Sequence, residues 1–392
     1  MRLTATRSSI TSGGGAVLDP NAPSLDLNFA DSKSLVDATT GANLVAFTRA
    51  SSGTYIDSNG LIQTAVTNAP RFDHDPATGE SLGLLIERES RTNYCTNSNS
   101  PGGWSPTNTA SSQTFDAVTA PDGSTITQGF RLPNRTSRVY PTVSSPGTIV
   151  PVASIYARAV SGTTTLSLFV QGSIVASDIS VPSDRWVRMT GTTTSRTVTA
   201  FSVRGNNSQS SDVYLWGAQL EEGSFPTSLI PTSGSTVTRA ADVASIEGAN
   251  FSSWYNQSEG TVFVEVEASG AAPIVGFDDG STSARWRVGY ASSNNSAIVV
   301  VDGGVAQTNI NTPVNTTPYN QFNKLAGAIA VNNLSLAFNG ALTSDSSLSV
   351  PVVNALSLGA SIGVSTILNG HIARLAYFPT RLPDATLQNI TS

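Results

Sequence analysis

Hydrophobic and polar positions alternate along this chain in short runs that turn residues separate. In the run 260–267, Val262, Val264 and Val266 fall on one face, while Glu265 and Glu267 fall on the other. Such a two-residue period is typical of a strand with one buried face. Between residues 95 and 235, no segment sustains the 3.6-residue period of a helix. The pattern predicts an all-β protein built of antiparallel sandwiches, with further strands at 150–160, 165–170, 185–190, 198–203, 212–216, 274–277, 285–290, 297–301, 324–331, 334–339 and 356–358.

Turn residues group these runs into hairpins and larger units. The sequences Ser58-Asn59-Gly60 and Asn339-Gly340 predict hairpin turns, since Asn-Gly readily takes the positive φ values of a type I′ turn. A connector rich in Pro, Ser, Thr and Gly lies within residues 214–246. One strand pattern ends there and another begins after it, so we predict a hinge between two β domains.

The chain then divides into four expected segments. Residues 1–22 are rich in Ser, Thr and Gly and predict an extended N-terminal arm, which we expect a partner chain, rather than the body of the same chain, to hold. Residues 23–94 form a small β-rich linking module, residues 95–235 a first sandwich and residues 236–392 a second.

The composition limits the classes of partner. Charged residues make up only 12% of the 392 residues, the net charge is −6, and Lys33 and Lys324 are the only lysines. No basic stripe is available to neutralise phosphates, so we predict no nucleic-acid binding. The single Cys95 excludes an intrachain disulfide, and Cys95 with two histidines cannot form a zinc cluster of Cys and His ligands. No apolar run approaches the roughly 20 residues that span a bilayer, and the N-terminus lacks a signal-peptide core, so we predict no membrane insertion and assembly in a cytoplasm.

The densest charge in the sequence lies between residues 68 and 93. We predict that Arg71, Asp73, Glu87, Arg88 and Arg91 form structural ion pairs or an interface. The neighbouring Asp73-His74-Asp75 also invites a catalytic or metal-binding hypothesis. We do not adopt this hypothesis, because the residues that follow are typical of an ordinary turn.

Two stretches of the chain carry motifs that are similar to those of known proteins. Trp216-Gly217-Ala218-Gln219-Leu220-Glu221-Glu222-Gly223, with Pro226-Thr227-Ser228 and Ile230-Pro231-Thr232, resembles the closing segment of jelly-roll, carbohydrate-binding-like domains in phage structural proteins. Arg49-Ala50-Ser51-Ser52-Gly53-Thr54-Tyr55-Ile56-Asp57, Asn68-Ala69-Pro70-Arg71-Phe72-Asp73 and Gly83-Leu84-Leu85-Ile86-Glu87 resemble a module of phage fibre and virion-surface proteins. The resemblance implies a virion structural protein.

The last third of the chain carries three motifs in order: Lys324 to Ile329 with Leu334 to Gly340, then Leu368 to Pro379, then Leu382 to Gln388. These resemble an adjacent strand pair, the closing strand and the short helix of the concanavalin A-like or laminin G-like sandwich. Members of this family bind sugars, sometimes with calcium. For calcium the candidates are Asp278 and Asp279, but an Asp-Gly turn explains them better, so we expect no cofactor.

Aromatic residues beside polar donors are the candidates for a carbohydrate-binding surface, because a sugar ring stacks on an aromatic plane. These candidates are Trp254, Tyr255, Trp286, Arg287 and Tyr290. Core packing is the competing role for the tryptophans.

These observations lead to three hypotheses on function. The first is a non-enzymatic fibre or spike subunit that contacts a host cell-surface glycan as a homo-oligomer, with a trimer expected by analogy with fibres. The second is a capsid decoration or tail-structural protein without a ligand, which predicts that Trp254, Trp286 and Tyr290 are buried. The third is a polysaccharide depolymerase, which requires carboxylates that converge in a cleft between domains.

Overall fold

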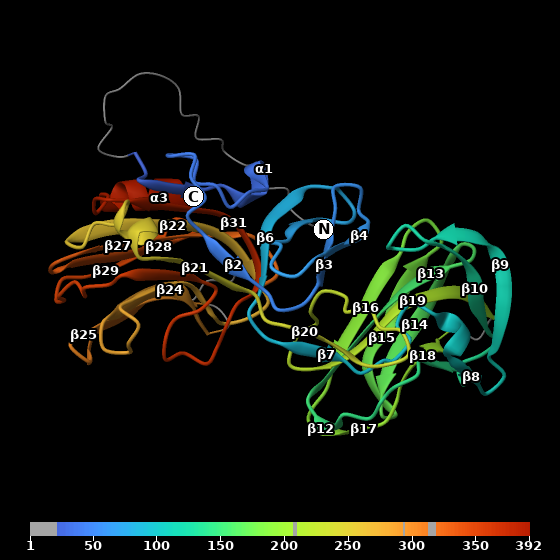
Figure 1. Ribbon diagram of the computed structural model, residues 1–392. Helices are drawn as coiled ribbons and strands as arrows, with labels where there is room; N and C mark the ends of the chain where they lie inside the picture. Colours follow the sequence, from blue (N-terminus) through green and yellow to red (C-terminus); the bar gives the residue numbers. More distant parts are fainter. Residues whose placement is uncertain (1–21, 207–209, 293–294, 313–318) are drawn as a thin grey trace.

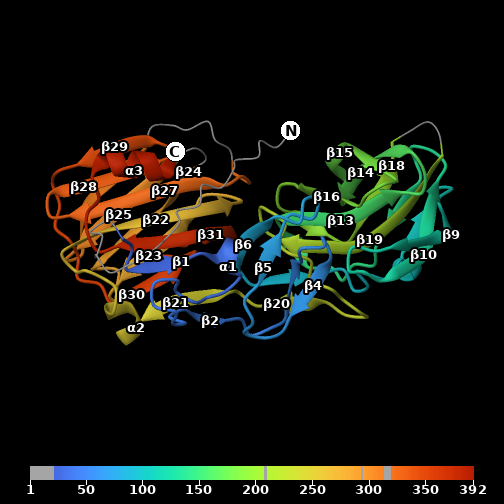
Figure 2. The ribbon, with the colours of Figure 1, turned by 90° about the horizontal axis from the view of Figure 1, so that it is seen from above.

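The computed structural model describes residues 22–206, 210–292, 295–312 and 319–392. Figures 1 and 2 show two β lobes side by side, joined by a narrow neck. The larger lobe contains residues 22–90 and 240–392, and the smaller lobe contains residues 94–235. The prediction of an all-β protein with two antiparallel sandwiches is confirmed. The expected N-terminal arm, residues 1–22, lies almost entirely outside the described residues.

Two sheets form the larger lobe. The first contains, in spatial order, β29 (Ala341–Asp345), β28 (Asn333–Phe338), β27 (Asn323–Ala330), β22 (Glu259–Ala268), β31 (Asn369–Phe378), β6 (Ser81–Glu87) and β5 (Phe72–His74), and β1 (Leu25–Leu27) also pairs with β31. The second contains β2 (Ala46–Thr48), β21 (Val243–Glu247), β30 (Ala355–Leu358), β23 (Pro273–Asp278), β24 (Arg285–Ser292), β25 (Asn295–Asp302) and β26 (Val305–Asn311). The helices are α1 (Phe29–Ser32), α2 (Ala249–Ser252) and α3 (Asp384–Thr391).

Two five-stranded sheets form the smaller lobe. One contains β16 (Val187–Thr192), β13 (Pro151–Ala159), β19 (Ser211–Glu222), β10 (Thr125–Leu132) and β9 (Ser111–Thr119). The other contains β15 (Ser173–Pro182), β14 (Thr163–Val170), β18 (Phe201–Gly205), β11 (Arg138–Tyr140) and β8 (Ser105–Thr107). A short pair, β12 (Gly147–Ile149) and β17 (Arg196–Val198), and the 3-10 helix η1 (Pro101–Gly103) complete this lobe.

The first and last parts of the chain build the larger lobe together. We expected residues 23–94 to be a separate linking module, but β1 and β6 both pair with β31, and β2 pairs with β21. The smaller lobe is therefore inserted between two halves of one sandwich. The neck is the antiparallel pair β7 (Arg91–Asn93) and β20 (Val237–Arg239), in which the chain enters and leaves the smaller lobe. The second strand of this neck lies within the predicted hinge.

Strand alternation places the core where the sequence predicted it. Val262, Val264 and Val266 of β22 are fully buried between the two sheets of the larger lobe. The opposite face of the same strand packs Phe263 beneath α3. The smaller lobe has its own apolar core between its two sheets.

Both predicted hairpins form. Ile56 pairs with Ile62 in the hairpin of β3 (Gly53–Ile56) and β4 (Ile62–Ala65). At the second turn, Asn339 and Gly340 have φ values of 45° and 81°, as a type I′ turn requires. Only Gly60 of the first turn has a positive φ, and there the Asp57 side chain accepts the backbone N–H groups of Asn59 and Leu61.

Candidate functional site

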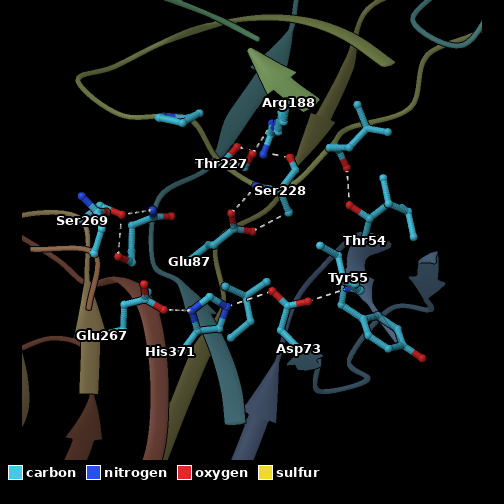
Figure 3. A pocket seen from close by; sticks show the side chains of 18 of the residues that line it. Thr54, Tyr55, Asp73, Glu87, Arg188, Thr227, Ser228, Glu267, Ser269 and His371 are labelled. Carbon is cyan, nitrogen blue, oxygen red and sulfur yellow. Dashed lines mark hydrogen bonds and ion pairs between the residues drawn. The ribbon is translucent and has the colours of Figure 1, made fainter. Parts of the chain in front are cut away.

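A pocket of about 200 Å³ lies where the two lobes meet (Figure 3). One wall comes from β22 and β31 of the larger lobe, a second from β3 and β5, and a third from β16 and the segment 226–229 of the smaller lobe. We call the segment 226–229 the strap. The wall residues combine apolar side chains with fixed hydrogen-bonding groups.

His371 is clamped between two carboxylates at the edge of this pocket. Its Nε2 lies 2.8 Å from Asp73 Oδ2 and its Nδ1 lies 3.2 Å from Glu267 Oε2, as Figure 3 shows. Both ring nitrogens can donate only in the imidazolium form. Burial alone would lower the pKa of His371, but hydrogen bonds to the two carboxylates outweigh it and raise the pKa from 6.5 to about 9. The imidazole is therefore a fixed cation at neutral pH.

Three strands position the clamp that Asp73, Glu267 and His371 form. His371 lies opposite Glu267 in the β22–β31 pairing and opposite Leu85 in the β31–β6 pairing, while Asp73 lies on β5 at the edge of the same sheet. Gly83 permits this approach, because it has a φ of 93° and a Cβ there would lie 2.3 Å from a backbone oxygen of β31. We expected Glu267 to share a solvated face with Glu265; its partner His371 draws it into the pocket wall instead.

The clamp predicts how stability depends on pH. A raised pKa in the folded state means that its contribution is full below about pH 6.5 and is lost as the pH rises through about 9. We expect the free energy of unfolding to fall by roughly 3 kcal/mol across that window. Urea unfolding of the wild type and of His371→Gln at several pH values checks this prediction, since the free energy of unfolding of the variant should not fall across this window. If that of the wild type does not fall either, His371 is not held as a cation between Asp73 and Glu267.

Beneath the pocket lies a buried network of ion pairs, which we call the neck network. It consists of Arg49, Arg71, Glu87, Arg239 and Asp242, each at most 2% exposed. Asp242 lies 3.3 Å from Arg49 Nη1 and 2.5 Å from Arg71 Nη2. Glu87 lies 2.7 Å from Arg71 Nη1 and 3.1 Å from Arg239 Nε. The network thus joins the segments that precede and follow the smaller lobe.

Glu87 also holds the strap. Its carboxylate accepts the backbone N–H of Ser228 at 2.6 Å and the Ser228 hydroxyl at 2.7 Å, both visible in Figure 3. Burial alone would raise the pKa of Glu87, but Arg239 and Arg71 outweigh it and hold the pKa well below its usual range. Glu87 is a permanent anion and is unsuited to donate a proton near neutral pH.

The smaller lobe fixes the other side of the strap. Arg188 donates to the carbonyl oxygen of Thr227 at 2.7 Å and lies over the ring of Tyr156 at 5.6 Å. Thr227 donates its hydroxyl and its N–H to Glu221, at 2.7 and 2.9 Å. Burial raises the pKa of Glu221 despite these bonds. The pocket is therefore preformed, with its polar groups held in place from both lobes.

The predicted aromatic surface does not form. Trp254, Trp286 and Tyr290 are buried in the core of the larger lobe, where Trp286 stacks on Phe277 with the ring centroids 4.1 Å apart. Tyr255 packs against the same core and accepts the indole N–H of Trp286 at 3.0 Å. Arg287 is half-buried on β24. A ring enclosed by the core offers no face to a sugar, so these residues do not make the platform that we expected.

The predicted charge cluster comes together in part. Arg71 and Glu87 belong to the neck network, and Asp73 belongs to the His371 clamp. Arg88 is half-buried nearby, and burial lowers the pKa of its guanidinium. Arg91 pairs with Glu89 and lies over the ring of Phe225 at 5.1 Å. Ion pairing was therefore the correct interpretation for Arg71, Asp73, Glu87 and Arg91.

Several site residues escaped the sequence interpretation, among them Arg49, Arg239, Asp242 and Ser228. One signal was available: Arg239 and Asp242 are the only charged residues between positions 223 and 246 of a chain with few charges. A buried charge requires a partner, so isolated charges in such a chain are candidates for long-range pairing.

Metal binding finds no support among the described residues, in which no group of three or more His, Cys, Asp and Glu side chains could hold an ion. Asp278 and Asp279 instead accept the backbone N–H groups of Gly280 and Ser281, as in an ordinary turn. No helix in the described part of the chain is long and apolar enough to cross a membrane.

Comparisons with known proteins give structural neighbours only. No protein-family model matches the sequence, and no curated protein matches it. Among solved structures, the CBM40 domain of a Ruminococcus gnavus IT-sialidase bound to alpha2,3 sialyllactose is 14% identical, with a TM-score of 0.31, and covers 35% of this chain and 84% of its own. Domain 4 of the arabinanase AbnA from Geobacillus stearothermophilus, in complex with arabinotriose, is 9% identical, with a TM-score of 0.31, and covers 44% of this chain and 84% of its own. The binding domain of botulinum neurotoxin serotype D is 12% identical, with a TM-score of 0.30, and covers 38% of this chain and 40% of its own.

Proposed function

We propose that this chain is a structural protein of a bacteriophage virion, a fibre or spike subunit whose interlobe pocket binds a saccharide of the host surface. The phage assignment is supported by the sequence resemblance of the 49–87 and 216–232 segments. The binding assignment rests on one observation, the preformed pocket between the lobes. The N-terminal arm would join the chain to other virion proteins, and a homo-oligomer, a trimer by analogy with fibres, would multiply weak sites.

The pocket chemistry suits a small polyhydroxylated ligand. Partly exposed carboxylate, imidazolium, guanidinium and hydroxyl groups face it from Glu267, His371, Arg188 and Ser269. Apolar side chains between them can cover the C–H faces of a sugar ring. Its volume corresponds to about seven liquid waters, which fits a monosaccharide unit rather than a long chain segment. Fixed polar groups in a concave, partly apolar site are typical of ligand pockets.

One observation favours a purely structural role instead. The burial of Trp254, Trp286 and Tyr290 is what a decoration or tail-structural protein without a ligand predicted. In that case the pocket would be filled by water only, and the neck network would serve the rigidity of the subunit.

A depolymerase also meets one of its requirements, since Asp73, Glu87 and Glu267 all line the interlobe pocket. Each of them is engaged, however: Asp73 and Glu267 by His371, and Glu87 by arginines that lower its pKa. A glycosidase needs one carboxyl whose pKa is raised so that it can act as a general acid. We therefore prefer a binding function to a catalytic one.

A substitution that blocks the pocket tests the proposal. Ser269→Trp places a large ring at the mouth, and Ser346→Trp makes the same change at an exposed position on the other side of the lobe. We expect wild type and Ser346→Trp to bind the same spots of a host-glycan array and Ser269→Trp to lose at least about tenfold in affinity. Equal binding by all three proteins, or binding by none, would contradict the proposal that the pocket binds a saccharide. Release of reducing sugar would support the depolymerase hypothesis.

A further inference from the structure

An arginine pair on the outer face of the smaller lobe stands apart from the interlobe pocket. On β11 and β18, Arg138 lies directly opposite Arg204. Their neighbours Val139 and Val203 point into the core, so both arginines point outward. Like charges directly opposite each other destabilise a sheet unless something else offsets the repulsion.

A shared aromatic ring offsets part of the repulsion between the two arginines. Both guanidinium groups lie close to the ring of Phe169 on β14, with their carbon atoms 4.4 and 4.5 Å from its centroid. Phe169 follows the core residue Leu168, faces outward and yet is only 3% exposed. The two arginine side chains thus cover a hydrophobic ring on a surface that otherwise faces solvent, and the ring holds both cations in place.

The charge of the pair is not neutralised by a carboxylate in direct contact. Within the described residues, neither Arg138 nor Arg204 forms an ion pair; Arg204 donates only to the side chain of Asn206. The carboxylate of Asp178 acts on Arg204 from a greater distance than an ion pair, and it accepts from that same Asn206. Arg135 adds a third cation, and its guanidinium donates to the backbone oxygen of Asn206. Burial and the neighbouring Arg138 and Arg135 lower the pKa of Arg204, as expected where positive charges gather.

Two polar atoms of this surface have no hydrogen-bond partner among the described residues. They are Nε of Arg204 and the hydroxyl of Thr107, which lies opposite Arg138 on β8, and both atoms are buried. Buried polar atoms are normally satisfied, so an acceptor placed beside this row would satisfy both donors. Thr107, Arg138 and Arg204 form that row across three neighbouring strands.

We propose that this row is a binding site for an oxyanion carried by a saccharide, a carboxylate or a sulfate group. Guanidinium groups bind such groups by paired N–H donors in one plane, which a lysine cannot reproduce. Phe169 fixes the two forks, and the hydroxyl of Thr107 supplies a further donor. The site lies on the smaller lobe and does not depend on the interlobe pocket.

Titration calorimetry at low ionic strength tests the site with glucuronic acid, glucose 6-sulfate and neutral glucose. We expect one of the two anionic sugars to bind and glucose to bind at least about tenfold more weakly, because charge-assisted hydrogen bonds contribute most of the affinity. The tighter anionic sugar identifies the group as carboxylate or sulfate. If neither binds more tightly than glucose, the proposal is overturned.

Variants separate this site from general charge effects. Arg138→Gln should lose about tenfold or more in affinity, and Arg138→Lys should recover only part of it. Arg131→Gln is the control, because Arg131 is likewise an arginine on a strand of the smaller lobe but pairs with Asp212. Equal losses in Arg131→Gln and Arg138→Gln would overturn the proposal. Ser269→Trp should leave the binding of the anionic sugar unchanged. The proposal for the interlobe pocket and the proposal for this site can therefore fail separately. An unchanged thermal melting temperature confirms that each variant is folded.

Discussion

Asp242→Asn is expected to lower the free energy of unfolding by about 3–5 kcal/mol, the usual cost of removing one partner from a buried ion pair. Asp242 is fully buried, and its carboxylate faces Arg49, Arg71 and the backbone N–H of Glu87. An asparagine keeps the shape but not the charge, and its amide group would turn a donor toward other donors. Arg49 would then lose its carboxylate partner, and Arg71 and Arg239 would share the carboxylate of Glu87.

Urea unfolding measures this change, with Asp212→Asn as the control. Asp212 also pairs with an arginine, Arg131, at 2.8 Å, but that pair is partly exposed to solvent. We expect the control to change the unfolding free energy by no more than about 1 kcal/mol. If Asp242→Asn is as mild as the control, the neck network is not what joins the two halves of the larger lobe.

Local features of the fold were predictable, since they depend on neighbouring residues. The alternation of Val262, Val264 and Val266 and the turn at Asn339-Gly340 both appear in the structure. Each follows from a period or a turn preference that acts within about ten residues.

Long-range pairings were not predictable in the same way. Leu25 pairs with Tyr377, and Asp73 reaches His371 across 298 positions of the sequence. Nothing in the residues near position 73 specifies which distant strand completes the sheet. The insertion of the smaller lobe hides this pairing further, because the sequence between the two halves reads as a complete domain.

The aromatic platform failed for a reason that the sequence itself contains. Trp286, Val288 and Tyr290 alternate with Arg285 and Arg287 on β24. A two-residue period places Trp286 and Arg287 on opposite faces of the sheet, so they could not serve one sugar. The face that holds Val288 is the buried one.

The core role of Trp286 makes the second strong prediction. Trp286→Ala should lower the free energy of unfolding by about 3–5 kcal/mol, since it opens a cavity beside Phe277 and removes the donor to the Tyr255 hydroxyl. Trp286→Phe keeps a stacked ring and should cost less, although the buried hydroxyl of Tyr255 still loses its donor. Urea unfolding of both variants checks the order.

Saccharide binding by the same variants distinguishes a core role of Trp286 from a role as a sugar-binding platform. Under the core interpretation, any Trp286 variant that remains folded at the assay temperature binds as the wild type does, because the ring is 0% exposed. Under the platform interpretation, stability would change by less than about 1 kcal/mol, as for most surface substitutions, and binding would be lost. The two interpretations therefore predict opposite results in both measurements, and a stable, non-binding Trp286→Ala protein would require the core of the larger lobe to open in solution.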